Sequence, residues 1–202
     1  MSFIIKKEEV LQKYIASYTA LCPGLTEEEL QFIYNNLSIS EYEKKDFFLN
    51  YREIQREMGY VYRGLLRSYY IDKKGKRITI SFINENSYAA DYPSFLQQKP
   101  SKYYIECIEP TIIVKLPYLK IQEAYKRYKG FEKYGRLIAE QILIQKQDRI
   151  ESFLFEDAEE RYKRFMNKNS HLVNRISLSH LSSYLGIERQ SLSRIRKKMA
   201  DR

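Results

Sequence analysis

Residues Ser177–Met199 read SLSHLSSYLGIERQSLSRIRKKM and hold two short apolar stripes separated by a glycine. The first stripe has the spacing i, i+3, i+7 and comprises Leu178, Leu181 and Leu185. The second repeats that spacing with Leu192, Ile195 and Met199. This spacing places each stripe on one face of a helix. Gly186 can adopt the left-handed conformation that ends a helix, and the small Ser182 allows two helices to approach closely. The stretch therefore predicts a helix-turn-helix.

The outward side of the second predicted helix carries polar and cationic side chains. They are Arg189, Gln190, Ser191, Arg194, Lys197 and Lys198. Arginine and glutamine can form paired hydrogen bonds with base edges, and cations neutralise phosphates. Residues 161–202 hold eleven basic and two acidic residues, so their net charge of +9 equals that of the whole chain. We therefore expect double-stranded DNA as a partner, because a helical hairpin with a merely solvated basic face accounts less well for this charge asymmetry.

The chain before this motif changes from helix to strand patterns and back. The first forty residues have helical spacing, with a capping-box pattern at Thr26–Glu29. Strand patterns follow at 60–71, 77–83, 103–107 and 111–116, with a hairpin turn at Asp72–Lys76. Helical patterns return at 119–128, 131–147, 149–155 and 157–166, with a break at Gly130. The order predicts an α+β protein with a small antiparallel sandwich or roll.

Several classes of protein are disfavoured by composition. No stretch approaches the ~20 apolar residues of a membrane span, and the N-terminus lacks a secretory signal, so we expect a cytoplasmic protein without a membrane partner. Two cysteines and two histidines lack the spacing of metal ligands, so no metal site and no cofactor is expected. A barrel enzyme of the cupin type needs His/Glu metal clusters, and no predicted strand holds a histidine. We therefore do not expect an enzyme.

The longer helix over 131–147 needs a partner for its apolar residues. It can pack on the roll of its own chain, or it can pair with its copy in a homodimer. We favour the homodimer, because two recognition helices would then read half-sites one DNA turn apart. The residues expected at that interface are Tyr134, Ile138 and Ile142.

The order of elements resembles the Crp/Fnr superfamily of bacterial transcription regulators. The most specific residues are Tyr184–Ile187 followed by Leu192–Ile195, and Glu159–Tyr162 is similar to a segment of many short members. The resemblance implies an N-terminal antiparallel β-roll (a double-stranded β-helix), a long dimerisation helix and a C-terminal helix-turn-helix domain, over 1–120, 121–147 and 148–202. The chain stops soon after the recognition helix, so we expect the β-hairpin wing to be truncated or absent. A palindromic operator bound by a homodimer is implied, with RNA polymerase as a further partner.

The resemblance also assigns roles to residues of the motif. Arg189, Gln190 and Arg194 fall where the family contacts bases, and Ser177, Ser179 and Ser191 fall where it bonds phosphates. Lys197 and Lys198 are expected to add phosphate contacts. Cyclic-AMP receptor proteins carry Glu at the position of Gln190. Since Gln pairs with adenine whereas Glu accepts from cytosine, the operator should differ.

The predicted roll departs from the cyclic-nucleotide binders. Those proteins carry a Gly-Glu pair and then an arginine that holds the cyclic phosphate, whereas this chain has no such pair and has Ser101 at the arginine position. The neighbouring Lys102 could supply a cation, but a lysine cannot make the bidentate phosphate contact of an arginine. We expect no control by cyclic AMP and leave the effector open; the candidate contacts are Lys102, Arg77, Tyr88 and Tyr104. The alternative function is a small-molecule or partner-binding roll with a non-specific basic tail that anchors it to DNA.

Overall fold

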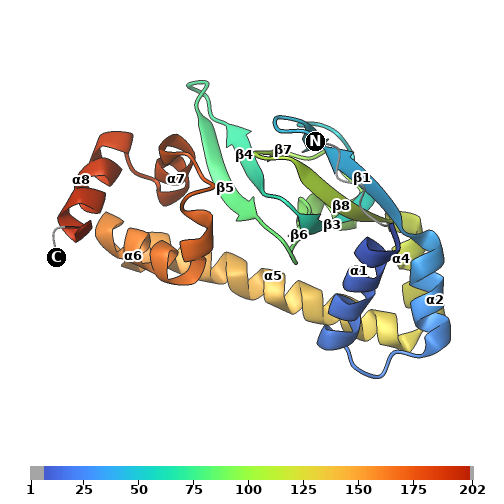
Figure 1. Cartoon of the computed structure of the whole chain (residues 1–202). Coiled ribbons are helices and arrows are strands. Elements are labelled where there is room, and N and C mark those ends of the chain that lie inside the picture. The colour runs from blue at the N-terminus through green and yellow to red at the C-terminus, as the bar shows by residue number, and fades with distance from the viewer. Residues whose placement is uncertain (1–6, 201–202) are drawn as a thin grey trace. The chain divides into compact units, whose positions relative to one another are not determined.

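The computed structural model describes residues 7–200 of the chain (Figure 1). The N-terminal elements are α1 (Lys7–Leu21), α2 (Glu27–Asn36), β1 (Ser38–Tyr42), β2 (Phe47–Leu49), β3 (Glu57–Arg63), β4 (Leu66–Ile71), β5 (Arg77–Ile83), β6 (Tyr88–Ala89) and α3 (Tyr92–Gln97). The remaining elements are β7 (Tyr104–Cys107), β8 (Thr111–Pro117), α4 (Tyr118–Arg127), α5 (Lys129–Phe155), α6 (Ala158–Asn169), the 3-10 turn η1 (Ser170–Leu172), α7 (Leu178–Leu185) and α8 (Arg189–Ala200). The predicted α+β class is confirmed.

The strands form two four-stranded sheets, which confirms the predicted roll. One sheet has the order β1-β8-β3-β6 and the other the order β2-β7-β4-β5. The pairs β1–β8, β3–β8, β3–β6 and β2–β7 are antiparallel. The stretch 60–71 divides into β3 and β4 at Gly64, whose φ of +112° lies in a region that side chains disfavour. The hairpin turn at Asp72–Lys76 forms as expected, and the Asp72 carboxylate accepts from the backbone of Lys74 and Lys76.

Apolar side chains from both sheets fill the roll. The core cluster comprises Leu49, Val61, Leu66, Ile83, Ala89, Ile105, Cys107 and Ile113, with Tyr42 and Phe48 packed against it. Burial of these side chains supplies the main free energy that holds the sheets together. A second group of aromatic residues joins α1 to its neighbours: Tyr14 packs on Tyr60 of β3, and Tyr18 stacks on Tyr134 of α5 at 3.4 Å between ring centroids.

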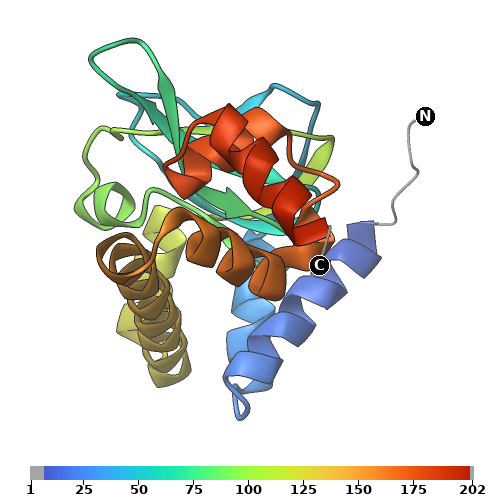
Figure 2. The ribbon, with the colours of Figure 1, turned by 90° about the vertical axis from the view of Figure 1, so that its left-hand side faces the viewer.

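The chain divides into two compact units. The first holds Phe82–Glu140 and the chain up to Ser68, and the second holds Tyr69–Ser81 and the chain from Gln141 onward. Figure 2 looks toward the C-terminal helices of the second unit, with α8 in red facing the viewer. Within residues 7–200, no helix combines the length and the apolar composition needed to cross a membrane.

Two details of the helices differ from the sequence prediction. The helix break predicted at Gly130 lies two residues earlier, at Tyr128 between α4 and α5, and Gly130 is the second residue of the 27-residue α5. The Gly130 amide instead donates to the buried Glu29 carboxylate at 3.0 Å, and a Cβ at Gly130 would lie 2.5 Å from Glu29 Oε1. The segments predicted separately at 131–147 and 149–155 are therefore parts of one helix. The capping box predicted at Thr26/Glu29 forms, and Asp157 and Glu160 form a second one at the start of α6.

Candidate nucleic-acid interface

The helix-turn-helix forms with the boundaries that its residues indicate. Ser177 is the N-cap of α7, and its hydroxyl accepts from the His180 amide at 3.2 Å. Gly186 ends α7 in the left-handed conformation, with φ +68° and ψ +34°. Leu181, Leu185 and Leu192 are buried between the helices. The turn is therefore built by local residues and closed by a small apolar core.

The structure brings the predicted DNA-contacting residues of α8 onto one outward side of that helix. Arg189, Gln190, Ser191, Arg194, Lys197 and Lys198 are all exposed. The opposite side holds the buried Leu192, with Ile195 and Met199 half-buried beside it. Ser177 and Ser179 of the α7 end are also exposed. This arrangement presents hydrogen-bond donors and cations to a partner while the apolar side holds the helix in place.

One of these cations has a partner inside the chain. Lys198 Nζ lies 2.6 Å from Glu159 Oε2 in α6, and Lys163 Nζ lies 2.9 Å from the other oxygen of Glu159. Hydrogen bonds from Lys198 and Lys163 lower the pKa of Glu159 from 4.5 to about 2. Lys198 must therefore release or share this carboxylate when it contacts a phosphate, which the sequence pattern did not indicate.

Two arginines, one in α5 and one in α6, donate hydrogen bonds to the last turn of α7, and the sequence did not predict either contact. The Arg149 guanidinium of α5 donates to the Tyr184 carbonyl, and its carbon lies 3.8 Å from the centroid of the Tyr184 ring. Arg161 of α6 donates to the Leu185 carbonyl at 3.0 Å. Both carbonyls belong to the last turn of α7, where unpaired oxygens and the negative end of the helix dipole favour cations. Burial lowers the pKa of Arg149.

Phe153 of α5 completes this support. Its ring centroid lies 4.3 Å from the Arg149 guanidinium carbon and 4.9 Å from that of Arg161. A Cβ at Gly186 would lie 2.6 Å from its Cε1 atom. Glycine is therefore required at position 186 for two reasons: the backbone has a positive φ, and the Phe153 ring occupies the space that a side chain would need. Arg149, Phe153 and Arg161 are visible in the sequence as charged and apolar residues of predicted helices. Their contacts with α7 could not be predicted, because the residues that they contact lie more than twenty residues further along the chain.

The residues expected at a dimer interface differ in their surroundings. Tyr134 and Ile138 are 5% and 9% exposed and pack within the first unit, whereas Ile142 is half-buried. The large exposed apolar residues of α5 lie nearer its C-terminal end and comprise Leu143, Ile144, Ile150, Phe153, Leu154 and Phe155. Tyr134 and Ile138 thus have partners inside the chain, which is the alternative that the apolar pattern of this helix also allowed.

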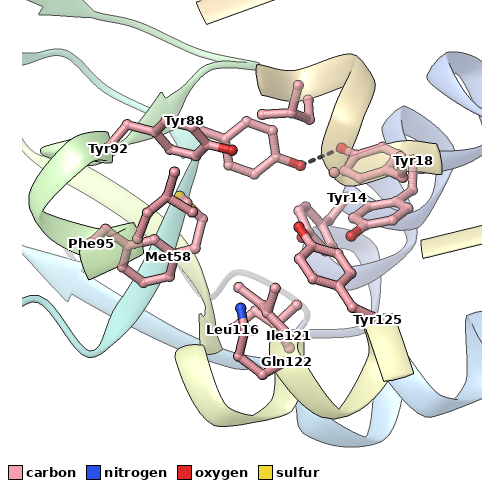
Figure 3. Close-up of a pocket in the computed structure, with 14 residues that line it drawn as sticks. Tyr14, Tyr18, Met58, Tyr88, Tyr92, Phe95, Leu116, Ile121, Gln122 and Tyr125 are labelled. Carbon is pink, nitrogen blue, oxygen red and sulfur yellow. Dashed lines mark hydrogen bonds between the residues drawn. The ribbon is translucent and has the colours of Figure 1, made fainter. Parts of the chain in front are cut away.

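The four candidate effector contacts also have different surroundings. Lys102 and Arg77 are exposed, and Tyr104 is half-buried among other aromatic rings. Tyr88 is half-buried, and its hydroxyl is hydrogen-bonded to the hydroxyl of Tyr134. Of the four, Tyr88 lines a hollow in the first unit (Figure 3).

Ser101, which we expect at the position of the family's phosphate-binding arginine, is buried in a network of hydrogen bonds. Its hydroxyl donates to Asp91 Oδ2 at 2.8 Å and accepts from the Tyr103 amide at 3.0 Å. The Asp91 amide donates to Gln55 Oε1 at 3.1 Å. Asp91 and Ser101 are only 5% and 2% exposed, so a buried carboxylate lies beside the Ser101 hydroxyl.

No protein-family profile matches the chain, and no curated protein sequence matches it. Solved structures do match. FixK2 from Bradyrhizobium japonicum has a TM-score of 0.71 at 17% identity, covering 82% of this chain and 85% of that one. A Eubacterium rectale protein assigned as a transcriptional regulator of the Crp/Fnr family has a TM-score of 0.70 at 17% identity, with 91% and 87% covered. CLP, a c-di-GMP-responsive global regulator from Xanthomonas campestris, has a TM-score of 0.69 at 12% identity, with 87% and 92% covered. This chain therefore has the fold of the Crp/Fnr regulators.

Proposed function

We propose that this chain is a transcription regulator that binds a palindromic DNA operator as a homodimer, and that cyclic AMP does not control it. The observation that carries the proposal is α8, which exposes Arg189, Gln190 and Arg194 to solvent while Leu192 is buried. The likeness to solved regulators supports it through the fold. Nothing in the proposal requires catalysis.

The roles on α8 follow from side-chain chemistry. Arg189 and Arg194 lie five residues apart in the N-terminal half of the helix, and each guanidinium can donate two hydrogen bonds to O6 and N7 of a guanine. Gln190 can bond an adenine in the same groove. Ser177, Ser179 and Ser191 donate to phosphate oxygens, and Lys197 and Lys198 neutralise phosphates. Specificity is thus assigned to two arginines and a glutamine, and general affinity to the other residues.

The dimer is proposed along the distal part of α5. Leu143, Ile150 and Leu154 are exposed, and their separations of seven and four residues keep them on one face of the helix. Pairing this face with its copy would bury side chains that a single chain leaves in water. A two-fold dimer would present two copies of α8 to half-sites about 34 Å apart.

Independence from cyclic AMP is proposed from the surroundings of Ser101. A cyclic phosphate brings a negative charge that needs a forked donor when water is excluded. Here Ser101 is bonded to the buried Asp91 carboxylate, and apolar side chains fill the roll. A phosphate would meet like charge, so we expect titration with cyclic AMP or cyclic GMP to show no stoichiometric binding. Micromolar binding that also tightens operator affinity would refute this part.

Selection of bound sites from random DNA duplexes tests the main proposal. We expect two inverted half-sites separated by one helical turn. Arg189→Ala and Arg194→Ala should each lose about 1–3 kcal/mol on the selected site and much less on random DNA. Lys197→Ala is the matched phosphate variant, and it should weaken both DNAs alike and reduce the salt slope by about 0.9. Equal losses on both DNAs for the two arginines would instead indicate a non-specific basic anchor.

A further inference from the structure

One hairpin of the strands belongs to the same compact unit as the helix-turn-helix. The chain leaves the first unit after Ser68, forms the turn between β4 and β5, and returns to the first unit at Phe82. We call residues 69–81 the β4–β5 hairpin. They form the second unit together with the chain from Gln141 onward, which includes α7 and α8. The contacts between this hairpin and α7 are therefore contacts within one unit.

A single serine of α7 holds the β4–β5 hairpin through two hydrogen bonds. The Ser183 hydroxyl donates to the Arg77 carbonyl at 3.0 Å and accepts from the Thr79 amide at 2.9 Å. Arg77 and Thr79 are two residues apart on β5, the outer strand of its sheet, so both backbone groups lie on the same edge of that strand. Thr79 is only 1% exposed, so this contact excludes water. The hairpin is therefore seated on α7 in one register.

The turn of the β4–β5 hairpin is strongly basic. Residues 72–77 hold four basic residues and one acidic residue, although residues 1–160 together have no net charge. The four cations are all exposed and comprise Lys73, Lys74, Lys76 and Arg77. The Asp72 carboxylate accepts from the backbone amides of Lys74 and Lys76, at 2.8 and 2.9 Å, so it is directed at the turn itself. The turn thus presents concentrated positive charge to a partner.

One of these cations lies beside the start of α8. Lys76 Nζ is 3.7 Å from Glu188 Oε1, and Glu188 directly precedes Arg189, the first residue of α8. The side chains of Lys76 and Glu188 are 65% and 84% exposed, so their attraction is weak and Lys76 is available to a stronger partner. The N-terminal residues of a recognition helix contact base edges in the major groove. This groove is only about 12 Å wide, so the phosphates of the duplex run close to the start of the helix.

We propose that the β4–β5 hairpin is a second DNA-contacting element, whose lysines bind phosphates of the duplex beside the half-site that α8 reads. This inference rests on the proposed function, because it requires α8 to enter the major groove. Lys73 and Lys74 contribute affinity without sequence preference, since a phosphate carries no base identity. Ser183 fixes the hairpin on α7, so the lysines and the recognition helix approach the duplex together.

Two pairs of adjacent lysines allow a matched test. Lys73→Gln/Lys74→Gln removes two charges from the hairpin and keeps most of each side chain. Lys44→Gln/Lys45→Gln makes the same change at two exposed lysines between β1 and β2 in the first unit. Fluorescence anisotropy of labelled duplexes measures binding by the full chain over a range of salt concentrations, on the selected operator and on random DNA.

We expect the hairpin variant to bind both DNAs about tenfold or more weakly at low salt, with a salt slope reduced by about 0.9 for each lysine that contacts a phosphate. The first-unit variant should bind as the wild type does. Lys73→Arg/Lys74→Arg keeps both charges and should retain wild-type affinity. Ethylation of a phosphate beside the half-site should weaken binding of the wild type and have little further effect on the Lys73→Gln/Lys74→Gln variant.

The outcomes separate this proposal from the proposed function. A wild-type protein that binds no DNA would refute the proposed function and the hairpin contact with it. If the wild type binds its operator and the hairpin variant binds equally well, only the hairpin contact is overturned. Equal losses in the hairpin and first-unit variants would also overturn it, because the effect would then come from net charge. A loss confined to the operator would overturn the assignment to phosphates.

Discussion

Replacement of Gly186 by alanine should destabilise the second unit by more than its backbone conformation alone explains. The residue has φ +68°, and an alanine in this left-handed region costs about 1–2 kcal/mol. The new Cβ would also lie 2.6 Å from Phe153 Cε1, so the ring must move. Moving it weakens its contacts with Arg149 and Arg161, each worth about 0.5–1 kcal/mol. The sum predicts a loss of roughly 2–4 kcal/mol in the free energy of unfolding.

Gly75→Ala is the matched control, since Gly75 has φ +77° and a methyl group added there would meet no atom within 4 Å. It should lose only the backbone part, about 1–2 kcal/mol. Urea unfolding followed by circular dichroism measures both variants, with similar slopes required for the comparison. In a Phe153→Ala background, which already lacks these ring contacts, Gly186→Ala should lose only the backbone part, and a double-mutant cycle measures this. If Gly186→Ala loses no more than Gly75→Ala, the reasoning about Phe153 is refuted.

Three further predictions concern the helices. Ile150→Glu should convert the dimer to monomers in sedimentation and weaken operator binding, whereas an unchanged dimer would exclude the distal face of α5. Glu159→Gln should lower the urea midpoint near pH 7. Lys198 and Lys163 lower the pKa of the Glu159 carboxylate, which stabilises the fold only while it is ionised, so the difference from wild type should shrink as the pH falls from 4.5 toward 2. A difference independent of pH would contradict this. Glu29→Ala should lower the free energy of unfolding in urea by about 2–4 kcal/mol, because the buried Glu29 carboxylate accepts hydrogen bonds from the Thr26 and Gly130 amides. A loss under about 1 kcal/mol would show that water replaces the carboxylate as the acceptor.

Features that depend on neighbouring residues could be predicted from the sequence. The turn at Gly186, the hairpin at Asp72–Lys76 and the two capping boxes all involve contacts within about five residues, so their patterns are visible in the chain itself. The outward side of α8 could be predicted for the same reason, because the spacing of Leu192, Ile195 and Met199 defines the side that packs inward.

Tertiary structure alone decided which partner each buried side chain has. An apolar spacing shows that Tyr134 and Ile138 are buried but not by what, and here the covering residues belong to their own unit. Arg149 reaches a carbonyl 35 residues away, and the Gly130 amide in the first turn of α5 finds its acceptor in Glu29. The physical reason is that periodicity records the burial of a side chain, whereas its neighbour is set by how distant segments pack.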